Sequence, residues 1–521
     1  MHQPTYRTPS FVSWLLVVAA TVAPAPGHSS PPSIGSGANV APAPDLGELR
    51  RDLTDRDEKK RRSAVRKLVE LGTEEAWFLV LGALEDPDAQ VADEAQLQLA
   101  DAGAPRVQAA LLGKEGLESK QPLVRMRVAE LLGRSQGSIA SADLLRAAGD
   151  KEPKVRRMAL WSLERALAAS RLTLSKEDRE RGALVAIAEK DRDASVRGAA
   201  LFALAAWEKS GRSVPELQAL LAEGARSKGA EMRAAAAALL GKHGGPGGEA
   251  LAIQLSRDES VAVRSAALAA LVPLGTRAGA GALVDCLESE PHIRLRRRAA
   301  AGLERLSGLR GRLDPRPFRD WHSKLPEDWK AEDVDRSVEL DRGDTVASLY
   351  GLPILSDNFA VLIDMSGSMW NPKDGVVPKT LVDLEVGKLL RSLEETTRFN
   401  LMPYATEPTR LWERTDLATK RNVSRAVEWF EQNRLSGKGN LWDAFELALE
   451  DPGVDTLVLF TDGAPTGGPH WNLHLISALI AERNRYAGLA IDVVLTENGD
   501  NKRLWRDIAE STGGLYTEVK S

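Results

Sequence analysis

A short pattern that recurs eight times between residues 45 and 310 constrains the fold of this chain more than any other feature. The pattern has an apolar residue, replaced by Lys60 in the first copy, usually an arginine next, usually a small residue four positions on and a leucine after four more. The clearest copies read VRRMALWSL from Val155, VRGAALFAL from Val196, VRSAALAAL from Val263 and LRRRAAAGL from Leu295. Looser copies begin at Lys60, Val91, Val124 and Met232, so the period is 31 to 41 residues.

Steps of four and eight residues place the apolar, small and leucine positions on one face of an α-helix. Acidic turns such as EDPDAQ and GDKEPK precede several copies and are typical of helix caps. A single pair of helices cannot bury such a stripe alone, so the units must stack. We therefore predict an all-α solenoid over residues 45–310.

The arginine of the pattern suggests two interpretations. A row of arginines can bind an anionic ligand, but an arginine at the same place in every unit more often pairs with an acid or a carbonyl of a neighbouring unit. We expect the second role. The arginines concerned are Arg125, Arg156, Arg197, Arg233, Arg264 and Arg296.

The repeated VR..A...L motif resembles the HEAT-repeat family over about half of the chain. The resemblance implies an architecture, and it implies a function only loosely, because such solenoids mostly offer long binding surfaces.

The first 27 residues have the order of a secretory signal peptide: the basic Arg7, an apolar run from Phe11 to Val22, then small residues and prolines. Residues 28–44, rich in Ser, Gly, Ala and Pro, form a predicted disordered leader. We therefore expect export to the periplasm, the cell envelope or the medium. An uncleaved membrane anchor is the alternative, although the apolar run is short for a span.

Composition excludes several classes of protein. Hydrophobic residues make up 43% and charged residues 27%, and the mature chain holds no apolar run long enough for a membrane span. The single cysteine, Cys286, cannot form an intramolecular disulfide. Net charge is −5, with the negative excess in residues 311–521, so nucleic acid is not an expected partner.

Residues 311–355 form a charged linker or cap with aromatic residues, and residues 356–521 form a second domain. In that domain, short apolar runs alternate with amphipathic stretches, which predicts a doubly wound α/β fold. Its ligand site should lie at the carboxyl ends of the central strands. The predicted strands are residues 358–364, 398–405, 455–462, 489–495 and 514–519.

Two of these strands end in an acid that begins a turn: Asp364 in LIDMSGSM and Asp462 in LFTDGAPTGG. Parallel strands would bring both carboxylates to one edge of the sheet, with Ser366 and Ser368 beside them. Oxygen ligands that are mostly neutral hydroxyls suit Mg²⁺, with Mn²⁺ or Ca²⁺ as alternatives. Such an ion keeps positive charge and open positions, so an acidic side chain of a protein partner could complete its shell.

DMSGSM and FTDGAP resemble the two acidic loops of von Willebrand factor A (VWA) domains, from about residue 356 to 519. The resemblance implies a Rossmann-like fold with a metal-ion-dependent adhesion site, whose ligands would be Asp364, Ser366 and Ser368, with Asp462 acting through water. Where this family commonly has a threonine ligand, the chain has Gly439, in GKGNLWDA. The adjacent Asn440 or a water could substitute, or the site could be degenerate.

The complete arrangement resembles exported bacterial proteins that combine these two modules. We expect a non-enzymatic binding or scaffold protein, with the solenoid as a second interaction surface. One alternative is a cofactor subunit of an ATPase or chelatase complex, which the signal peptide disfavours. A second alternative, an enzyme, lacks an identifiable base or nucleophile.

Overall fold

The computed structural model describes residues 45–332, 347–372, 375–496 and 501–519. The predicted signal peptide and leader, and part of the predicted linker, lie outside these residues. The chain divides into two compact units after Ser175. This division falls inside the repeats, because the later repeats pack together with the α/β domain; α12 contacts α21, for example. The two units are therefore described separately.

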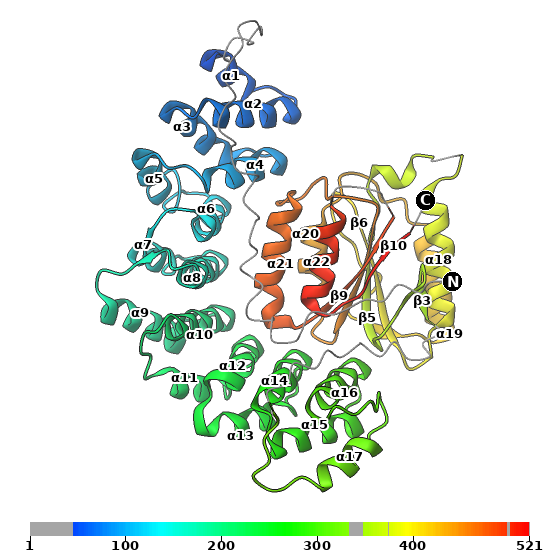
Figure 1. Ribbon diagram of the computed structural model, residues 1–521. Coiled ribbons are helices and arrows are strands. Elements are labelled where there is room, and N and C mark those ends of the chain that lie inside the picture. Colours follow the sequence, from blue (N-terminus) through cyan, green and yellow to red (C-terminus); the bar gives the residue numbers. More distant parts are fainter. Residues whose placement is uncertain (1–44, 333–346, 373–374, 497–500, 520–521) are drawn as a thin grey trace, which may run out of the picture. The chain divides into compact units, whose positions relative to one another are not determined.

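The first unit, residues 45–175, is built from helices (Figure 1). In chain order its elements are α1 (Leu46–Asp52), α2 (Glu58–Leu71), α3 (Glu74–Gly82), η2 (Ala83–Glu85), α4 (Ala89–Leu99), α5 (Pro105–Leu112), α6 (Pro122–Arg134), β1 (Ile139–Ala140), α7 (Ser141–Ala147), α8 (Pro153–Ala168) and β2 (Leu172–Thr173). The first four copies of the sequence pattern begin near the starts of α2, α4, α6 and α8. The predicted turn chemistry is present as well, since Asp88 caps α4 by accepting a hydrogen bond from the Gln90 backbone N–H.

The second unit continues the repeats and adds the α/β domain. Its helical part contains α9 (Glu177–Lys190), α10 (Ala194–Lys209), α11 (Leu217–Gly224), α12 (Ala230–His243), α13 (Gly245–Leu255), α14 (Val261–Leu274), α15 (Arg277–Ser289), α16 (Ile293–Ser307) and α17 (Arg316–Ser323). The last four copies of the pattern lie in α10, α12, α14 and α16. In the predicted linker, α17 packs on α15 and α16 through the buried Phe318.

The repeated arginines have the structural role expected for them. Arg125 makes a bidentate pair with Asp150, at 2.6 and 2.9 Å, and donates to the Ser119 carbonyl. Arg233 repeats this arrangement with Asp258 and the Ser227 carbonyl. Each of the other four arginines also donates to a carbonyl, and Arg197 and Arg264 also pair with a glutamate.

A buried polar network in the first unit has no counterpart in the sequence pattern. Glu130 on α6 is 1% exposed and accepts hydrogen bonds from Arg134, Arg165 and Gln96. The neighbouring Arg127 pairs with the buried Asp93 on α4. Three consecutive repeats are thus linked by charged groups, where repeat proteins ordinarily stack apolar faces.

The α/β domain has a six-stranded sheet in the order β10-β9-β8-β5-β6-β7, parallel throughout except for β7. Figure 1 shows α20, α21 and α22 on one face, with α18 and α19 on the other. The elements are β3 (Ser348–Leu349), β4 (Leu352–Pro353), β5 (Asn358–Asp364), η3 (Gly367–Trp370), α18 (Pro378–Ser392), β6 (Arg398–Tyr404), β7 (Asp416–Leu417), α19 (Lys420–Glu431), α20 (Leu441–Ala448), β8 (Thr456–Thr461), α21 (Leu473–Ala487), β9 (Ala490–Leu495), α22 (Lys502–Thr512) and β10 (Tyr516–Glu518).

This arrangement confirms the predicted fold class, a helical-repeat region followed by a doubly wound α/β domain. All five predicted strands form, with shifts of one or two residues at their ends, whereas the short antiparallel β7 was not predicted. The central strands β5 and β8 are buried along their whole length, as their two-sided apolar sequence requires. Among the described helices, none combines the length and apolarity that a membrane span requires.

Candidate metal centre

Asp364 and Asp462 lie at the same edge of the sheet. Asp364 is the last residue of β5, and Asp462 directly follows β8, the parallel strand beside it. Both side chains are largely buried, with 2% and 8% of their surface exposed. The carboxyl ends of the central strands therefore present two carboxylates together, which is where a doubly wound fold places its ligands.

The turn after β5 brings the two serine hydroxyls next to Asp364. The backbone N–H of Ser366 donates to Asp364 Oδ1 at 2.8 Å, and this bond closes the turn. The hydroxyl oxygens of Ser366 and Ser368 are 3.1 Å apart. Two hydroxyls therefore converge beside a buried carboxylate, in a spacing compatible with ligands of one small cation.

Electrostatics at Asp364 favour a positive charge. Burial, and then the charge of Asp462, raise the pKa of Asp364 to about 6. Its Oδ2 accepts a hydrogen bond from the Thr461 hydroxyl at 3.1 Å. The hydrogen bonds that it accepts come from neutral groups, so near neutral pH a carboxylate is held here at a cost that a bound cation would offset.

The loop before α20 completes one side of this site. Gly439 is buried, and a Cβ atom at this position would lie 3.4 and 3.5 Å from the two carboxylate oxygens of Asp364. The position therefore faces the site, as the family resemblance implies, but it brings no hydroxyl. The Gly439 N–H donates to the Thr466 hydroxyl at 2.7 Å, and this bond ties the loop to the turn after β8.

Asn440 has a structural role of its own. Its amide oxygen accepts a hydrogen bond from the Asp443 N–H and caps α20, and its amide nitrogen donates to the Thr406 carbonyl and the Asp443 carboxylate. Asn440 could become a metal ligand only by giving up this cap. A water would therefore be a simpler substitute for the hydroxyl that Gly439 lacks.

The donor set fits a hard divalent cation. Asp364, Ser366 and Ser368 would contact the ion, and Asp462 would act directly or through a water. All of these donors are oxygen atoms, most are neutral, and together they suit Mg²⁺, Mn²⁺ or Ca²⁺ rather than a thiolate-seeking metal. Gly439 supplies no side-chain donor, so one more position of the ion would be left for solvent or for a ligand from outside.

Two threonines at the site were not predicted. Thr461 bonds Asp364 directly, and Thr466 holds the Gly439 loop. Thr461 precedes Asp462 in sequence, so its place at the end of a predicted strand was a usable signal. Thr466 lies in a turn whose path cannot be derived from local sequence.

His470 and His474, in the sequence HWNLH, lie in different environments. His470 is buried and packs edge-to-face on Trp442, whereas His474 is exposed in the first turn of α21. His470 precedes the helix, so the two imidazoles do not lie one turn apart on a helical face. Cys286 is buried in α15, and burial raises the pKa of its thiol to about 12, so it is no nucleophile near neutral pH.

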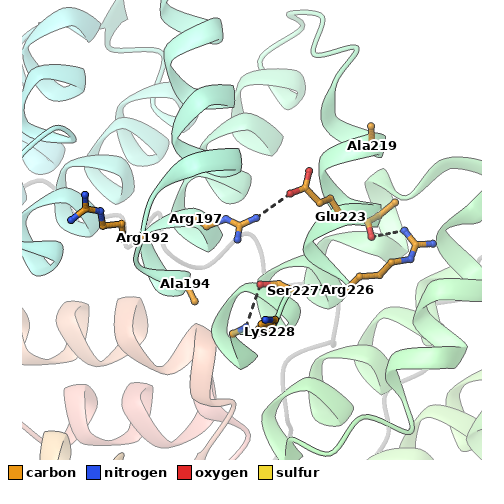
Figure 2. Close-up of a pocket in the computed structure, with 10 residues that line it drawn as sticks. Arg192, Ala194, Arg197, Ala219, Glu223, Arg226, Ser227 and Lys228 are labelled. Carbon is orange, nitrogen blue, oxygen red and sulfur yellow. Dashed lines mark hydrogen bonds and ion pairs between the residues drawn. The ribbon is translucent and has the colours of Figure 1, made fainter.

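The second unit also contains a cavity of about 750 Å³ among α10, α11 and α12 (Figure 2). Four of its lining residues, Arg192, Arg197, Arg226 and Lys228, are cationic. The only lining carboxylate, that of Glu223, pairs with Arg197 at 3.3 Å. The cavity therefore carries excess positive charge.

Comparisons with known proteins agree with this architecture. Residues 114–205 and 220–304 match the family model of HEAT repeats, and residues 358–521 match that of the von Willebrand factor type A domain. Mouse inter alpha-trypsin inhibitor, heavy chain 4, is 29% identical over 155 residues, which are 27% of this chain and 16% of that protein. The chain thus spans about a sixth of this relative.

Solved structures show more remote similarity. A von Willebrand factor type A protein from Catenulispora acidiphila is 16% identical, over 33% of this chain and 40% of its own, with a TM-score of 0.26. The YibA protein of Escherichia coli is 18% identical, over 50% of this chain and 93% of its own, with a TM-score of 0.33. Similarity at this level supports no functional argument.

Proposed function

We propose that this chain is an exported, non-enzymatic binding protein whose VWA domain captures a protein partner through a divalent cation. The observation that carries the proposal is the buried Asp364, with two serine hydroxyls beside it, at the carboxyl edge of the sheet. Proteins built on this domain are generally non-catalytic, which supports a binding role. Export is proposed from the signal-peptide pattern of the first 27 residues.

The cation would supply the bond to the partner. Mg²⁺ is the expected ion, with Mn²⁺ or Ca²⁺ as alternatives. Because the protein ligands are few and mostly neutral, the bound ion would keep positive charge and attract a carboxylate of the partner. Asp364, Ser366 and Ser368 would hold the ion, and Asp462 would contact it directly or through a water.

The helical repeats would supply a second surface. The cationic cavity among α10, α11 and α12 suits an acidic segment of a partner, since it carries four cationic side chains against one carboxylate. Arg192, Arg226 and Lys228 are exposed at this cavity. Contact at two places on one chain would raise the overall affinity without requiring either contact to be strong.

Titration of Mg²⁺ into the full chain by calorimetry tests the metal site. We expect saturable binding to the wild-type protein, and its loss in Asp364→Ala, because the substitution removes the one buried carboxylate that begins the turn. Mn²⁺ should give the same pattern. Equal Mg²⁺ binding by both proteins would contradict the assignment of the ligands, and no binding by either would leave a degenerate site that acts without metal.

Gly439→Thr is expected to tighten Mg²⁺ binding on the order of tenfold, because it adds a hydroxyl ligand beside Asp364. The substitution is sterically plausible, since the backbone of Gly439 is outside the left-handed region and its added Cβ meets only ordinary contacts. Gly439→Ala is the matched control, which adds the Cβ without the hydroxyl and should leave the affinity near that of the wild type. If the two variants bind Mg²⁺ equally, position 439 does not face the ion.

A further inference from the structure

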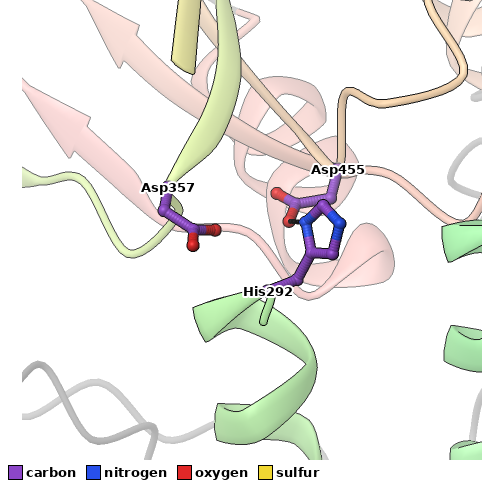
Figure 3. Close-up of side chains that lie close together, drawn as sticks. All are labelled: His292, Asp357 and Asp455. Carbon is purple, nitrogen blue, oxygen red and sulfur yellow. Dashed lines mark ion pairs between the residues drawn. The ribbon is translucent and has the colours of Figure 1, made fainter. Parts of the chain in front are cut away.

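A second cluster of candidate metal ligands lies at the opposite edge of the same sheet (Figure 3). Asp357 directly precedes β5 and Asp455 directly precedes β8, so both lie at the amino ends of these parallel strands. His292 directly precedes α16, the last helix of the repeats. One ligand atom from each of the three residues lies within 4.8 Å of the other two.

Hydrogen bonds hold the Asp455 carboxylate so that one oxygen is left for a ligand. Its Oδ1 accepts from the hydroxyls of Ser356, at 2.6 Å, and Thr456, at 2.7 Å. Its Oδ2 is buried, accepts no hydrogen bond from the described residues, and lies 3.7 Å from His292 Nδ1. Asp455 as a whole is 3% exposed. This oxygen faces an imidazole nitrogen and accepts no hydrogen bond. A metal ion bound between the two atoms would satisfy the buried oxygen.

Asp357 is oriented toward the same space. Its Oδ1 accepts from the Ile293 backbone N–H at 3.3 Å, a bond that ties it to the first turn of α16. Burial, and then the charge of Asp455, raise the pKa of Asp357. Two carboxylates are thus held close to each other beside one imidazole. A cation bound between them would be electrostatically favourable.

A cation of the protein already lies near this cluster. Arg294 Nη1 is 3.5 Å from the Thr456 hydroxyl, and the charges of Asp455 and Asp492 act on its guanidinium. Arg294 therefore offsets part of the negative charge but makes no bond to Asp455 Oδ2. The nearby Asp455 carboxylate raises the pKa of His292, which indicates that this space favours positive charge.

We propose that His292, Asp357 and Asp455 bind one divalent transition-metal ion, with Zn²⁺ the best match, and that the ion links α16 to the amino ends of β5 and β8. Imidazole nitrogen and carboxylate oxygen are donor types that Zn²⁺ accepts, and three protein ligands leave a coordination position for water. The ligand atoms would have to approach one another slightly, because ligands about 2.0–2.2 Å from one ion lie closer together than 4.8 Å.

Zn²⁺ titration of the full chain carrying Asp364→Ala tests this site with the other metal centre disabled. We expect one tight site by calorimetry, and Co²⁺ in its place should give the visible absorption bands of low-coordinate cobalt. His292→Gln and Asp357→Asn, each made in the same background, should weaken Zn²⁺ binding at least about tenfold and remove the cobalt bands. Zn²⁺ should also raise the thermal midpoint of the background protein but not that of the two variants.

His243→Gln in the same background is the matched control. His243 Nδ1 pairs with Glu208 at 2.6 Å, so it is also a histidine beside an acid, but it belongs to no three-residue cluster among the described residues. It should leave Zn²⁺ binding unchanged. Circular dichroism checks that each variant is folded. If His292→Gln does not fold, the result for Asp357→Asn decides the test.

Unchanged Zn²⁺ affinity in folded Asp357→Asn would overturn the proposal, as would the absence of a tight site in the background protein. An equal loss in His243→Gln would also overturn it, since the binding would then be diffuse. The test is independent of the VWA metal centre, because that site is tested by Mg²⁺ binding and its proposed ligands are different residues. Either site can therefore fail without the other.

Discussion

Asp364→Asn is expected to stabilise the metal-free protein at pH 7.5 while it abolishes Mg²⁺ binding. The wild-type carboxylate is buried beside Asp462, which raises its pKa to about 6 from an ordinary value of 3.8. A shift of that size corresponds to a cost on the order of 3 kcal/mol for keeping the group ionised in the folded protein. The amide is neutral and has the same shape, so it avoids this cost.

The sign of the pH dependence follows from the raised pKa. Between pH 4 and 6 the folded state holds more protons at Asp364 than the unfolded state, so stability falls as the pH rises through this window. Above pH 6 the full cost is present. The stability difference between Asp364→Asn and the wild type should therefore be largest above pH 6 and close to zero at pH 4.

Urea unfolding in EDTA at several pH values measures this difference, and the titrations shared by both proteins cancel in the comparison. Excess Mg²⁺ should restore stability to the wild type alone, because only the wild type binds it. Ser368→Ala is the matched control: it removes a proposed ligand without removing a buried charge, so it should weaken Mg²⁺ binding without the gain in stability. A less stable Asp364→Asn at pH 7.5 would show that the carboxylate is not held against an electrostatic cost.

Glu130→Gln is expected to destabilise the first unit by about 3 kcal/mol at neutral pH. Burial alone would raise the pKa of Glu130, but the charges and hydrogen bonds of Arg134 and Arg165 outweigh it and lower the pKa to about 2. The difference from the ordinary value of 4.5 corresponds to roughly 3 kcal/mol. The substitution also leaves two largely buried guanidinium groups without their shared carboxylate.

The pH dependence of this variant has the opposite sign to that of Asp364. A lowered pKa contributes stability that is fully present above pH 4.5 and is lost as the pH falls toward 2. The deficit of Glu130→Gln should therefore be constant near neutral pH and should shrink below pH 4.5.

Hydrogen exchange of peptides from α4, α6 and α8 measures the loss of stability in these three helices, independently of the second unit. Faster exchange in all three helices is expected, because the network connects them. Glu118→Gln, at an exposed position of the same unit, should change exchange little. An unchanged exchange rate in α4 and α8 of Glu130→Gln would show that the network does not couple the repeats.

Local sequence was sufficient to predict the repeated helices and the main strands of this fold. The repeat pattern marks α2, α4, α6, α8, α10, α12, α14 and α16, because a helix that stacks on similar neighbours needs the same apolar and small positions each time. The buried strands β5, β8 and β9 are equally clear, since a parallel strand covered on both faces is apolar at every position. Asp364, Ser366, Ser368 and Asp462 were identifiable because each lies in a short motif at a strand end.

Contacts between distant segments could not be derived in this way. Thr466 reaches Gly439 across 27 residues, and Ser356 reaches Asp455 across 99, so neither pairing has a local signal. The same holds for Glu130, whose partners lie on three different helices, and for His292, which approaches two strand starts of another domain. From sequence alone, a polar residue in a helix is expected to be exposed to solvent. Only the tertiary structure shows which residues surround it.

The sequence by itself determined the repeated helices, the order of the parallel strands along the chain and the acids that end two of them, because these depend on periodicity and on residues adjacent in the chain. Only the tertiary structure decided the rest: that Asn440 caps a helix, that position 439 faces Asp364, that Glu130 is buried among arginines, and that His292 lies beside Asp357 and Asp455. Burial and pairing depend on which distant segments approach one another, and chain order alone does not specify this.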